Sequence, residues 1–433
     1  MGMDPTRTTT RDIRRQNRSA LLSKLFFDGP RSRLELSQLT GLSSATVSTV
    51  TAELIDDLLV VEAGQVESNG GRPRVLLRVD PAYGYVIGVD VGETGVAVEL
   101  FDLSMRRHAT VFRPLASARP TPAAVVAEVV AGIAAVLNGV GWLPDAADGV
   151  PSPQPIDQKS IDIGSVIGVG IGVPGIVEHG DVVLVHAPTI DWNAVPLATM
   201  LAEHGLTAPV FIGNGAKTQA QAEMWFGAAR GARHAVVALV GSGVGAAVIT
   251  DGEPYQGFSS SAGEWGHTML VYGGRPCRCG ARGCLEAYVG AESILDRYAE
   301  ARRSGSGAVD GDDEVDEAAA IDALIRAAGK ASADDSVEAA LIAETIGYLG
   351  AGIGNLVNMF NPERVVLGGW AGLALGNALL PQIRAAARQH ALAHPYGQVS
   401  IELSQLGTDA VALGAATLPL AEFLAKGEDP RDR

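Results

Sequence analysis

Short apolar segments that end in glycine-rich turns recur along most of this chain. Helix-like stretches separate them, and they occupy residues 85–89, 166–171, 235–240 and 364–367. Segments of this length are typical of buried strands, and their alternation with helices indicates an α/β fold. We therefore expect an α/β body that begins after Pro81.

Charge is unevenly distributed along the sequence. The whole chain has a formal net charge of −16, whereas residues 1–33 hold eight basic and three acidic side chains, a local charge of +5. The remainder therefore carries −21. A basic N-terminal segment on an acidic body can attract DNA phosphates at one end only, although a solvated tail would have the same charge.

Residues 1–80 have the pattern of a winged helix-turn-helix domain. Helical spacing of apolar residues predicts a helix over 13–27, then a short second helix, the turn Thr40-Gly41-Leu42 and a third helix over 43–57. The β-rich residues 59–79 with their glycine-rich middle predict a two-stranded wing. The inner stripe of the third helix is expected to be Val47, Val50, Leu54 and Leu58.

The opposite face of that third helix carries small side chains that suit a major groove. Hydroxyl and methyl groups can contact base edges and thymine methyls there. We assign these contacts to Ser44, Ala45, Ser48 and Thr49. Because this face has no arginine, Arg72 and Arg74 of the Gly-Gly-Arg-Pro-Arg segment are expected to enter an A·T minor groove; a solvated linker is the alternative.

Three cysteines and one histidine form a compact set of soft metal ligands. Their spacing is His267-x9-Cys277-x-Cys279-x4-Cys284. Four such ligands favour tetrahedral Zn²⁺ and leave no open position, so we expect structural rather than catalytic zinc. A redox pair or an unliganded cysteine-rich turn is the alternative.

Other features narrow the class of protein. Three clustered cysteines cannot make a secreted disulfide framework, and no apolar run is long enough for a leader or a bilayer span. We therefore expect a cytoplasmic protein without membrane contact. Residues 144–160, and the acidic residues 302–335, are expected to be surface insertions, the second of them mobile.

The order of the motifs resembles the ROK family, which groups bacterial sugar kinases and sugar-responsive repressors. The similarity covers nearly the whole chain and is carried by residues 88–94, 172–175, 241–245, 263–286 and 361–369, together with the repressor-type leading domain. It implies an actin-like, two-lobed ATPase fold. The lobes would span 81–205 and 206–433, with the C-terminal helix packed back on the first lobe. It also implies a homodimer or homotetramer.

The resemblance further implies a sugar site and the remains of a nucleotide site. Sugar hydroxyls would be held by Asn214, Glu264, His267 and Glu286. The two glutamates could instead only stabilise helix ends or orient the zinc loop. The nucleotide remnants would be Asp90, Gly92, Thr94 and Gly243.

Two departures from the family argue against catalysis. The family's general-base Asp has its counterpart at Gly215, which has no group to accept a proton. Glu93 replaces the usual small residue of the phosphate turn, and its charge would repel phosphate. We expect a sugar-gated repressor that binds operator DNA; a sugar kinase with a regulatory head and an inducer-independent regulator are the alternatives.

Overall fold

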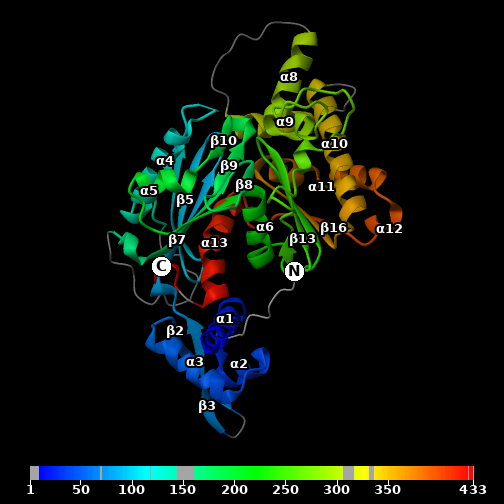
Figure 1. Ribbon diagram of the computed structural model, residues 1–433. Helices are drawn as coiled ribbons and strands as arrows, with labels where there is room; N and C mark the ends of the chain where they lie inside the picture. Colours follow the sequence, from blue (N-terminus) through cyan, green and yellow to red (C-terminus); the bar gives the residue numbers. More distant parts are fainter. Residues whose placement is uncertain are drawn as a thin grey trace, which may run out of the picture.

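A small N-terminal head and a larger α/β body make up the molecule (Figure 1). The computed structural model describes residues 9–68, 71–117, 119–143, 160–305, 316–330, 336–427 and 429–432. The described residues up to Val79 form the head, and the described residues after it form the body.

The head has the winged helix-turn-helix arrangement that its sequence pattern predicts. Its helices are α1 (Thr10–Asp28), α2 (Arg33–Thr40) and α3 (Ser44–Asp56). Its strands, in the sheet order β1-β3-β2, are β1 (Arg31–Ser32), β2 (Val60–Ser68) and β3 (Gly71–Val79). Thr9 and Ser32 start α1 and α2 with capping boxes. Gly41 ends α2 in the left-handed conformation, at φ +71°, and so allows the sharp turn into α3.

The core of the head differs from the predicted stripe at one position. Val47, Val50 and Leu54 are buried. Leu58, in contrast, has a φ of 63° and is 69% exposed. The prediction for Leu58 is wrong because α3 ends two residues earlier, and the next residue, Leu59, takes the core position instead.

A five-stranded sheet forms the first lobe of the body. In the order β11-β7-β4-β5-β6 its strands are β11 (Val210–Asn214), β7 (Val166–Val173), β4 (Tyr85–Val91), β5 (Gly95–Asp102) and β6 (Arg107–Pro114). The strands β4, β7 and β11 are parallel, and the hairpins through β5 and β6 are antiparallel. A smaller sheet and a helix adjoin it: β8 (Ile176–Glu178), β9 (Leu184–Ala187), β10 (Trp192–Val195) and α5 (Leu197–Glu203).

Two helices cover the opposite faces of this first sheet. On one face, α4 (Pro122–Leu137) packs against β5 and β6, and on the other α13 (Ala410–Lys426) packs against β4 and β7. A Cβ at Gly88 would lie 2.0 Å from the carbonyl oxygen of Ala412, and one at Gly170 only 1.7 Å from that of Ala415. Only glycine allows this approach. A C-terminal helix is therefore part of the first lobe.

A second five-stranded sheet forms the other lobe. In the order β14-β13-β12-β15-β16 its strands are β14 (Glu253–Pro254), β13 (Val244–Thr250), β12 (Ala235–Val240), β15 (Arg364–Gly368) and β16 (Ser400–Leu403). The helices of this half of the body are α6 (Gly215–Phe226), α7 (Glu286–Val289), α8 (Ala291–Gly305), α9 (Glu317–Ala328), α10 (Val337–Phe360), α11 (Trp370–His390) and α12 (Ala393–Tyr396). Helix α10 is apolar and long enough to cross a membrane, yet 61% of its most apolar window is buried inside the protein.

Part of the predicted mobile acidic insertion is ordered helix. Helix α8 continues to Gly305, and α9 buries Ile321 and Leu324 in the core of the second lobe. The prediction for residues 302–335 is therefore wrong here, because apolar residues three positions apart give α9 a face that packs on α10 and α11. Residues 306–315 and 331–335, and the predicted insertion 144–160 apart from Ser160, lie outside the described residues.

Candidate functional site

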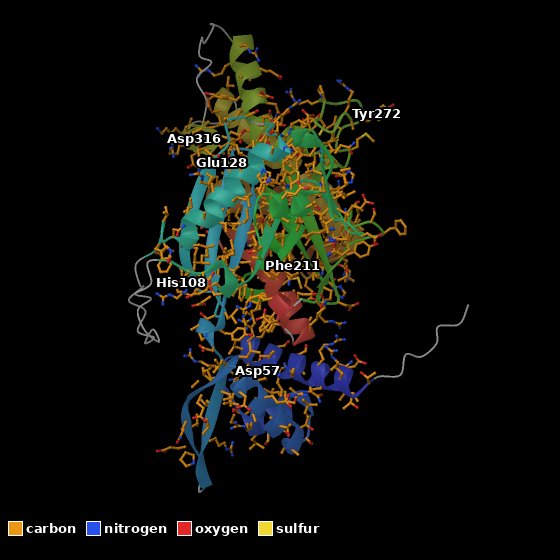
Figure 2. All side chains as sticks on the ribbon, turned by 60° about the vertical axis from the view of Figure 1, so that its left-hand side comes forward. Asp57, His108, Glu128, Phe211, Tyr272 and Asp316 are labelled. Carbon is orange, nitrogen blue, oxygen red and sulfur yellow. The ribbon has the colours of Figure 1, made fainter. Side chains whose placement is uncertain are left out.

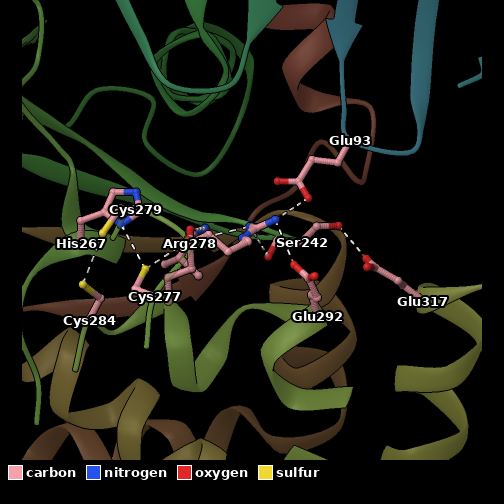
Figure 3. Close-up of polar contacts among 11 residues, drawn as sticks. Glu93, Ser242, His267, Cys277, Arg278, Cys279, Cys284, Glu292 and Glu317 are labelled. Carbon is pink, nitrogen blue, oxygen red and sulfur yellow. Dashed lines mark hydrogen bonds and ion pairs between the residues drawn. The ribbon is translucent and has the colours of Figure 1, made fainter. Parts of the chain in front are cut away.

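The four predicted metal ligands come together in the segment between β14 and α7, residues 255–285, which we call the cysteine loop (Figure 3). The three Sγ atoms and a ring nitrogen of His267 all lie within 4.8 Å of one another. The Sγ of Cys277 is 3.7 Å from His267 Nδ1, and the Sγ atoms of Cys279 and Cys284 are 3.8 Å apart. A tetrahedral ion with bonds of about 2.3 Å separates its ligands by about 3.8 Å. The observed spacing therefore fits a tetrahedral metal ion.

The electrostatics of the cysteines point the same way. All three cysteines are free, and a separation of 3.8 Å is far beyond a disulfide bond. Burial raises the pKa of the Cys277 and Cys284 thiols. Thiols in such surroundings stay protonated unless a cation stabilises the thiolates. The donor set thus suits a bound metal better than a redox pair.

Two glutamates lie beside this cluster. Glu286 is only 3% exposed; its Oε2 accepts a hydrogen bond from Val244 N–H at 2.9 Å, and its Oε1 is 3.7 Å from Cys277 Sγ. Glu264 directly precedes the 3-10 turn Trp265–His267. Burial raises the pKa of Glu264, and the charges of His267 and Lys217 oppose that rise. Three of the predicted sugar ligands, Glu264, His267 and Glu286, therefore lie within electrostatic reach of one another.

The fourth predicted sugar ligand, Asn214, caps helix α6. Its Oδ1 accepts a hydrogen bond from Lys217 N–H at 3.1 Å, and its Nδ2 donates to the carbonyl oxygen of Gly175 at 2.6 Å. The next residue is Gly215. A Cβ on Gly215 would have its nearest neighbours at 3.7 Å, an ordinary contact distance. A Cβ would therefore fit at position 215 without strain, and with glycine there the position has no proton acceptor.

An ion pair that sequence reasoning missed joins the glycine turn at residues 92–95 to the loop that carries the cysteines (Figure 3). Glu93 lies in the turn between β4 and β5 and accepts a hydrogen bond from Arg278 Nη1 at 2.7 Å. Arg278 stands between Cys277 and Cys279, and its Nη2 also donates to the carbonyl oxygen of Ser242 at 3.3 Å. The sequence pattern indicates a role for Glu93, whereas it gives position 278 only as the residue between two metal ligands.

The remaining nucleotide-turn residues serve the turn itself. Gly92 N–H donates to Gly95 O at 2.9 Å, and Thr94 O accepts from Leu115 N–H at 3.0 Å. Burial, and then the negative charge of Asp409, raises the pKa of Asp90 to about 7. These surroundings therefore disfavour the carboxylate form of Asp90 relative to its protonated form.

The residues assigned to DNA lie on the surface of the head. Ser44, Ala45, Ser48 and Thr49 are all exposed on α3. Arg74 is exposed on the hairpin, where it faces Val66 across the strands. Arg72 belongs to β3, but its side chain lies outside the described residues. In Figure 2, Asp57 of the head and Tyr272 of the cysteine loop are well separated along the molecule.

Helix α6 extends from the candidate sugar ligands to the head. Asn214 caps its first turn, and Trp225 near its end packs against α1. The Trp225 ring centroid lies 5.7 Å from that of Phe26 and 4.9 Å from that of Phe27, both edge-on. Helix α13 also packs against both α6 and α1. Two helices of the body therefore touch the head directly.

This architecture defines a class of protein: a two-lobed, actin-like body with a winged helix-turn-helix in front. The chain belongs to the ROK family, whose model matches residues 86–422. The xylose repressor of Caldicellulosiruptor bescii is 30% identical over 414 residues, 95% of this chain and 97% of that protein.

Two solved structures share the fold. A ROK family transcriptional regulator, a homolog of the E. coli MLC protein, has a TM-score of 0.74 at 24% identity and covers 96% of this chain and 97% of its own. A ROK family glucokinase from Streptomyces griseus, in complex with glucose and AMPPNP, has a TM-score of 0.61 at 26% identity and covers 77% and 99%. The fold is therefore shared by a regulator and a kinase.

Proposed function

We propose that this protein is a sugar-responsive transcriptional repressor, in which a sugar bound to the body changes the affinity of the head for operator DNA. The observation that carries the proposal is helix α6, which has Asn214 at its start and contacts with α1 at its end. The similarity to a xylose repressor along 95% of the chain supports the same function.

In this proposal the sugar is bound and not phosphorylated. Carboxylates accept hydrogen bonds from hydroxyls, and an amide can both donate and accept, so Glu264 and Asn214 suit a sugar. Glu286 and His267 would complete the set. Proton abstraction from the attacking hydroxyl has no acceptor at Gly215.

Zinc is the metal that the Cys277, Cys279, Cys284 and His267 set would hold. When bound it supplies a structural cross-link with all four positions filled by protein. Glu286 lies 3.7 Å from Cys277 Sγ, so a rigid cysteine loop would fix this carboxylate against the sugar. The protein itself then orients His267 and Glu286.

The head would read DNA through two elements. Helix α3 would place Ser44, Ala45, Ser48 and Thr49 in the major groove, and the hairpin would place Arg72 and Arg74 in the adjacent minor groove. A cytoplasmic homodimer or homotetramer would hold two heads at the spacing of two half-sites. No membrane contact enters this function.

A change in the body would reach the head through packed helices. A sugar that prefers one arrangement of the two lobes shifts the population toward that arrangement. Trp225 of α6 contacts α1, and α13 packs against α1, so the position of the head would follow. Sugar and DNA then affect each other's binding to the same extent.

The test begins with a thermal-shift screen of sugars and sugar phosphates on the full-length protein. Operator duplexes selected from random DNA are then titrated by fluorescence anisotropy with and without the sugar that binds. Glu264→Ala should abolish the sugar response and leave sugar-free DNA affinity intact. Glu253→Ala, an exposed acidic residue on β14, is the matched control and should respond like the wild type.

Two outcomes would contradict the proposal. A sugar that binds tightly without changing operator affinity would exclude the switch. Sugar-dependent ADP release at about 1 per second or faster would show an active kinase.

A further inference from the structure

Three charged side chains converge where two glycine turns, at residues 92–95 and 241–245, face each other. A Cβ placed on Gly243 would lie 3.4 Å from Glu286 Oε2, 3.7 Å from Arg278 Nη2 and 3.8 Å from Glu93 Oε1. Glu93 belongs to the first turn and Gly243 to the second. Glycine turns expose backbone amides that can receive a phosphate. Here the space between the turns already holds a carboxylate and a guanidinium.

The ion pair between Glu93 and Arg278 is shielded from water. The two side chains are 15% and 22% exposed, and their nearest atoms are 2.7 Å apart. Arg278 Nη1 is also 3.0 Å from Glu292 Oε2, and Arg278 Nη2 is 3.8 Å from Glu286 Oε1. Charge-assisted bonds are strong where water is excluded, and this one joins the first lobe to the cysteine loop.

The surroundings of this pair are negative. Glu317 accepts a hydrogen bond from Ser242 Oγ at 2.6 Å, next to the carbonyl oxygen that Arg278 contacts. Together Glu93, Glu286, Glu292 and Glu317 contribute four formal negative charges against one positive charge, a local sum of −3. A triphosphate or a sugar phosphate entering this space would be repelled, whereas a neutral sugar would not.

We infer that Glu93 and Arg278 are specificity-determining residues: their ion pair occupies the space of a phosphate between the lobes, so that the site takes an unphosphorylated sugar and rejects nucleotides. This inference rests on the proposed function and names the class of its effector. Glu93 supplies the repulsion and occupies the guanidinium. Arg278 keeps the neighbouring carboxylates, Glu286 among them, in place.

The two partners should therefore give opposite results when each is changed. Removing the Glu93 carboxylate frees Arg278 to donate to a phosphate, so anion binding should rise. Removing the Arg278 charge leaves the carboxylates uncompensated, so anion binding should stay absent and sugar binding should weaken. A merely structural ion pair would lower stability in both variants without this difference.

The experiment uses the full-length protein and Mg²⁺–AMPPNP as the probe. The wild type should show no binding by calorimetry at about 1 mM probe, while Glu93→Gly should bind at least roughly tenfold more tightly than that limit. Arg278→Gln should not bind the probe, and its sugar affinity should fall roughly tenfold. Glu300→Gln is the control, because it breaks the pair that Glu300 of α8 makes with Arg275 of the same loop (2.7 and 2.9 Å) and should match the wild type in both affinities.

Thermal unfolding and metal content identify variants that do not fold, and Glu93→Gln replaces Glu93→Gly if that variant is lost. The inference is overturned if the wild type binds AMPPNP, or if a folded, metal-loaded Glu93 variant gains no binding. It is also overturned if a sugar phosphate binds the wild type more tightly than its parent sugar. If no sugar changes operator affinity, the proposed function fails, and the nucleotide titration still tests the ion pair by itself.

Discussion

Replacing Trp225 with alanine tests whether α6 carries the effect of the sugar to the head. Trp225 contacts Phe26 and Phe27 of α1 with ring centroids 5.7 and 4.9 Å apart. Each edge-on aromatic pair contributes about 0.5–1.5 kcal/mol beyond its buried area, so the two pairs together contribute about 2 kcal/mol. The substitution leaves Asn214 and the cysteine loop untouched.

The free energy lost with the two aromatic contacts is comparable to the whole coupling free energy between sugar binding and DNA binding. Free energies of coupling between two sites are typically about 1–3 kcal/mol, and about 2 kcal/mol corresponds to a thirtyfold change in operator affinity. If the aromatic contacts carry most of it, the response of Trp225→Ala should fall from about thirtyfold to no more than about threefold. Sugar affinity measured without DNA should rise or fall by less than about threefold.

The assay is an operator titration at fixed salt with and without saturating sugar, together with calorimetry of sugar binding. Trp142→Ala is a matched control, since Trp142 is also half-buried but lies in the first lobe and donates its Nε1–H to Val136 O. A full sugar response in Trp225→Ala would refute the reasoning. A parallel loss of sugar affinity would show that Trp225 supports the sugar site itself.

Three further predictions follow from the metal loop, the wing and the first-lobe turn. The wild type should purify with about one zinc per chain and Cys279→Ser should lose it; elemental analysis decides, and metal-free protein that still folds and responds would contradict it. Arg72→Ala and Arg74→Ala should weaken operator binding and flatten the preference for A·T-rich flanks, measured by competition at fixed salt; equal weakening on all sequences would indicate phosphate contacts only. The pKa of Asp90 is raised from 3.8 to about 7, so the folded state favours the protonated form and loses stability as pH rises from about 4 to 7. Asp90→Asn should therefore match the wild type in thermal denaturation at pH 4 and exceed it at pH 8, by up to about 4 kcal/mol; a pH-independent difference would rule out this origin.

Local patterns predicted the head well. The positions of α1, α2, α3 and the hairpin follow from helical spacing, capping residues and a glycine turn, which all act within a few residues. The prediction for Leu58 is wrong because the helical period was extended past the end of α3. A shift of one residue brings Leu59 to the core instead. In α9 the acidic neighbours led to a prediction of a mobile segment. The apolar pair Ile321 and Leu324 instead holds the helix in place by packing in the core of the second lobe.

The candidate site likewise contains residues that the sequence predicts and a contact that it does not. The metal ligands, within eighteen positions of one another, are readable from their spacing, and the geometry brings them within 4.8 Å. The partner of Glu93 is not readable, because Arg278 lies 185 positions away and meets it only when the lobes are folded. The charge of Glu93 was visible in the sequence, but its neutralisation by a guanidinium depends on the tertiary structure.

Helix α13 also determines when the first lobe can finish folding during synthesis of the chain. The sheet of the first lobe uses β4 and β7, complete by Val173, but the helix that covers their glycine-lined face begins at Ala410. About 240 residues separate the two, which takes a ribosome roughly 12 to 50 s at 5–20 residues per second. During that interval the β4–β7 face of the nascent first lobe is uncovered, and so is the face of the head that packs on α13, where Phe423 shares a core with Leu21. A chain interrupted before residue 410 would keep the three helices of the head but would lack the helix that packs both on α1 and on the first-lobe sheet.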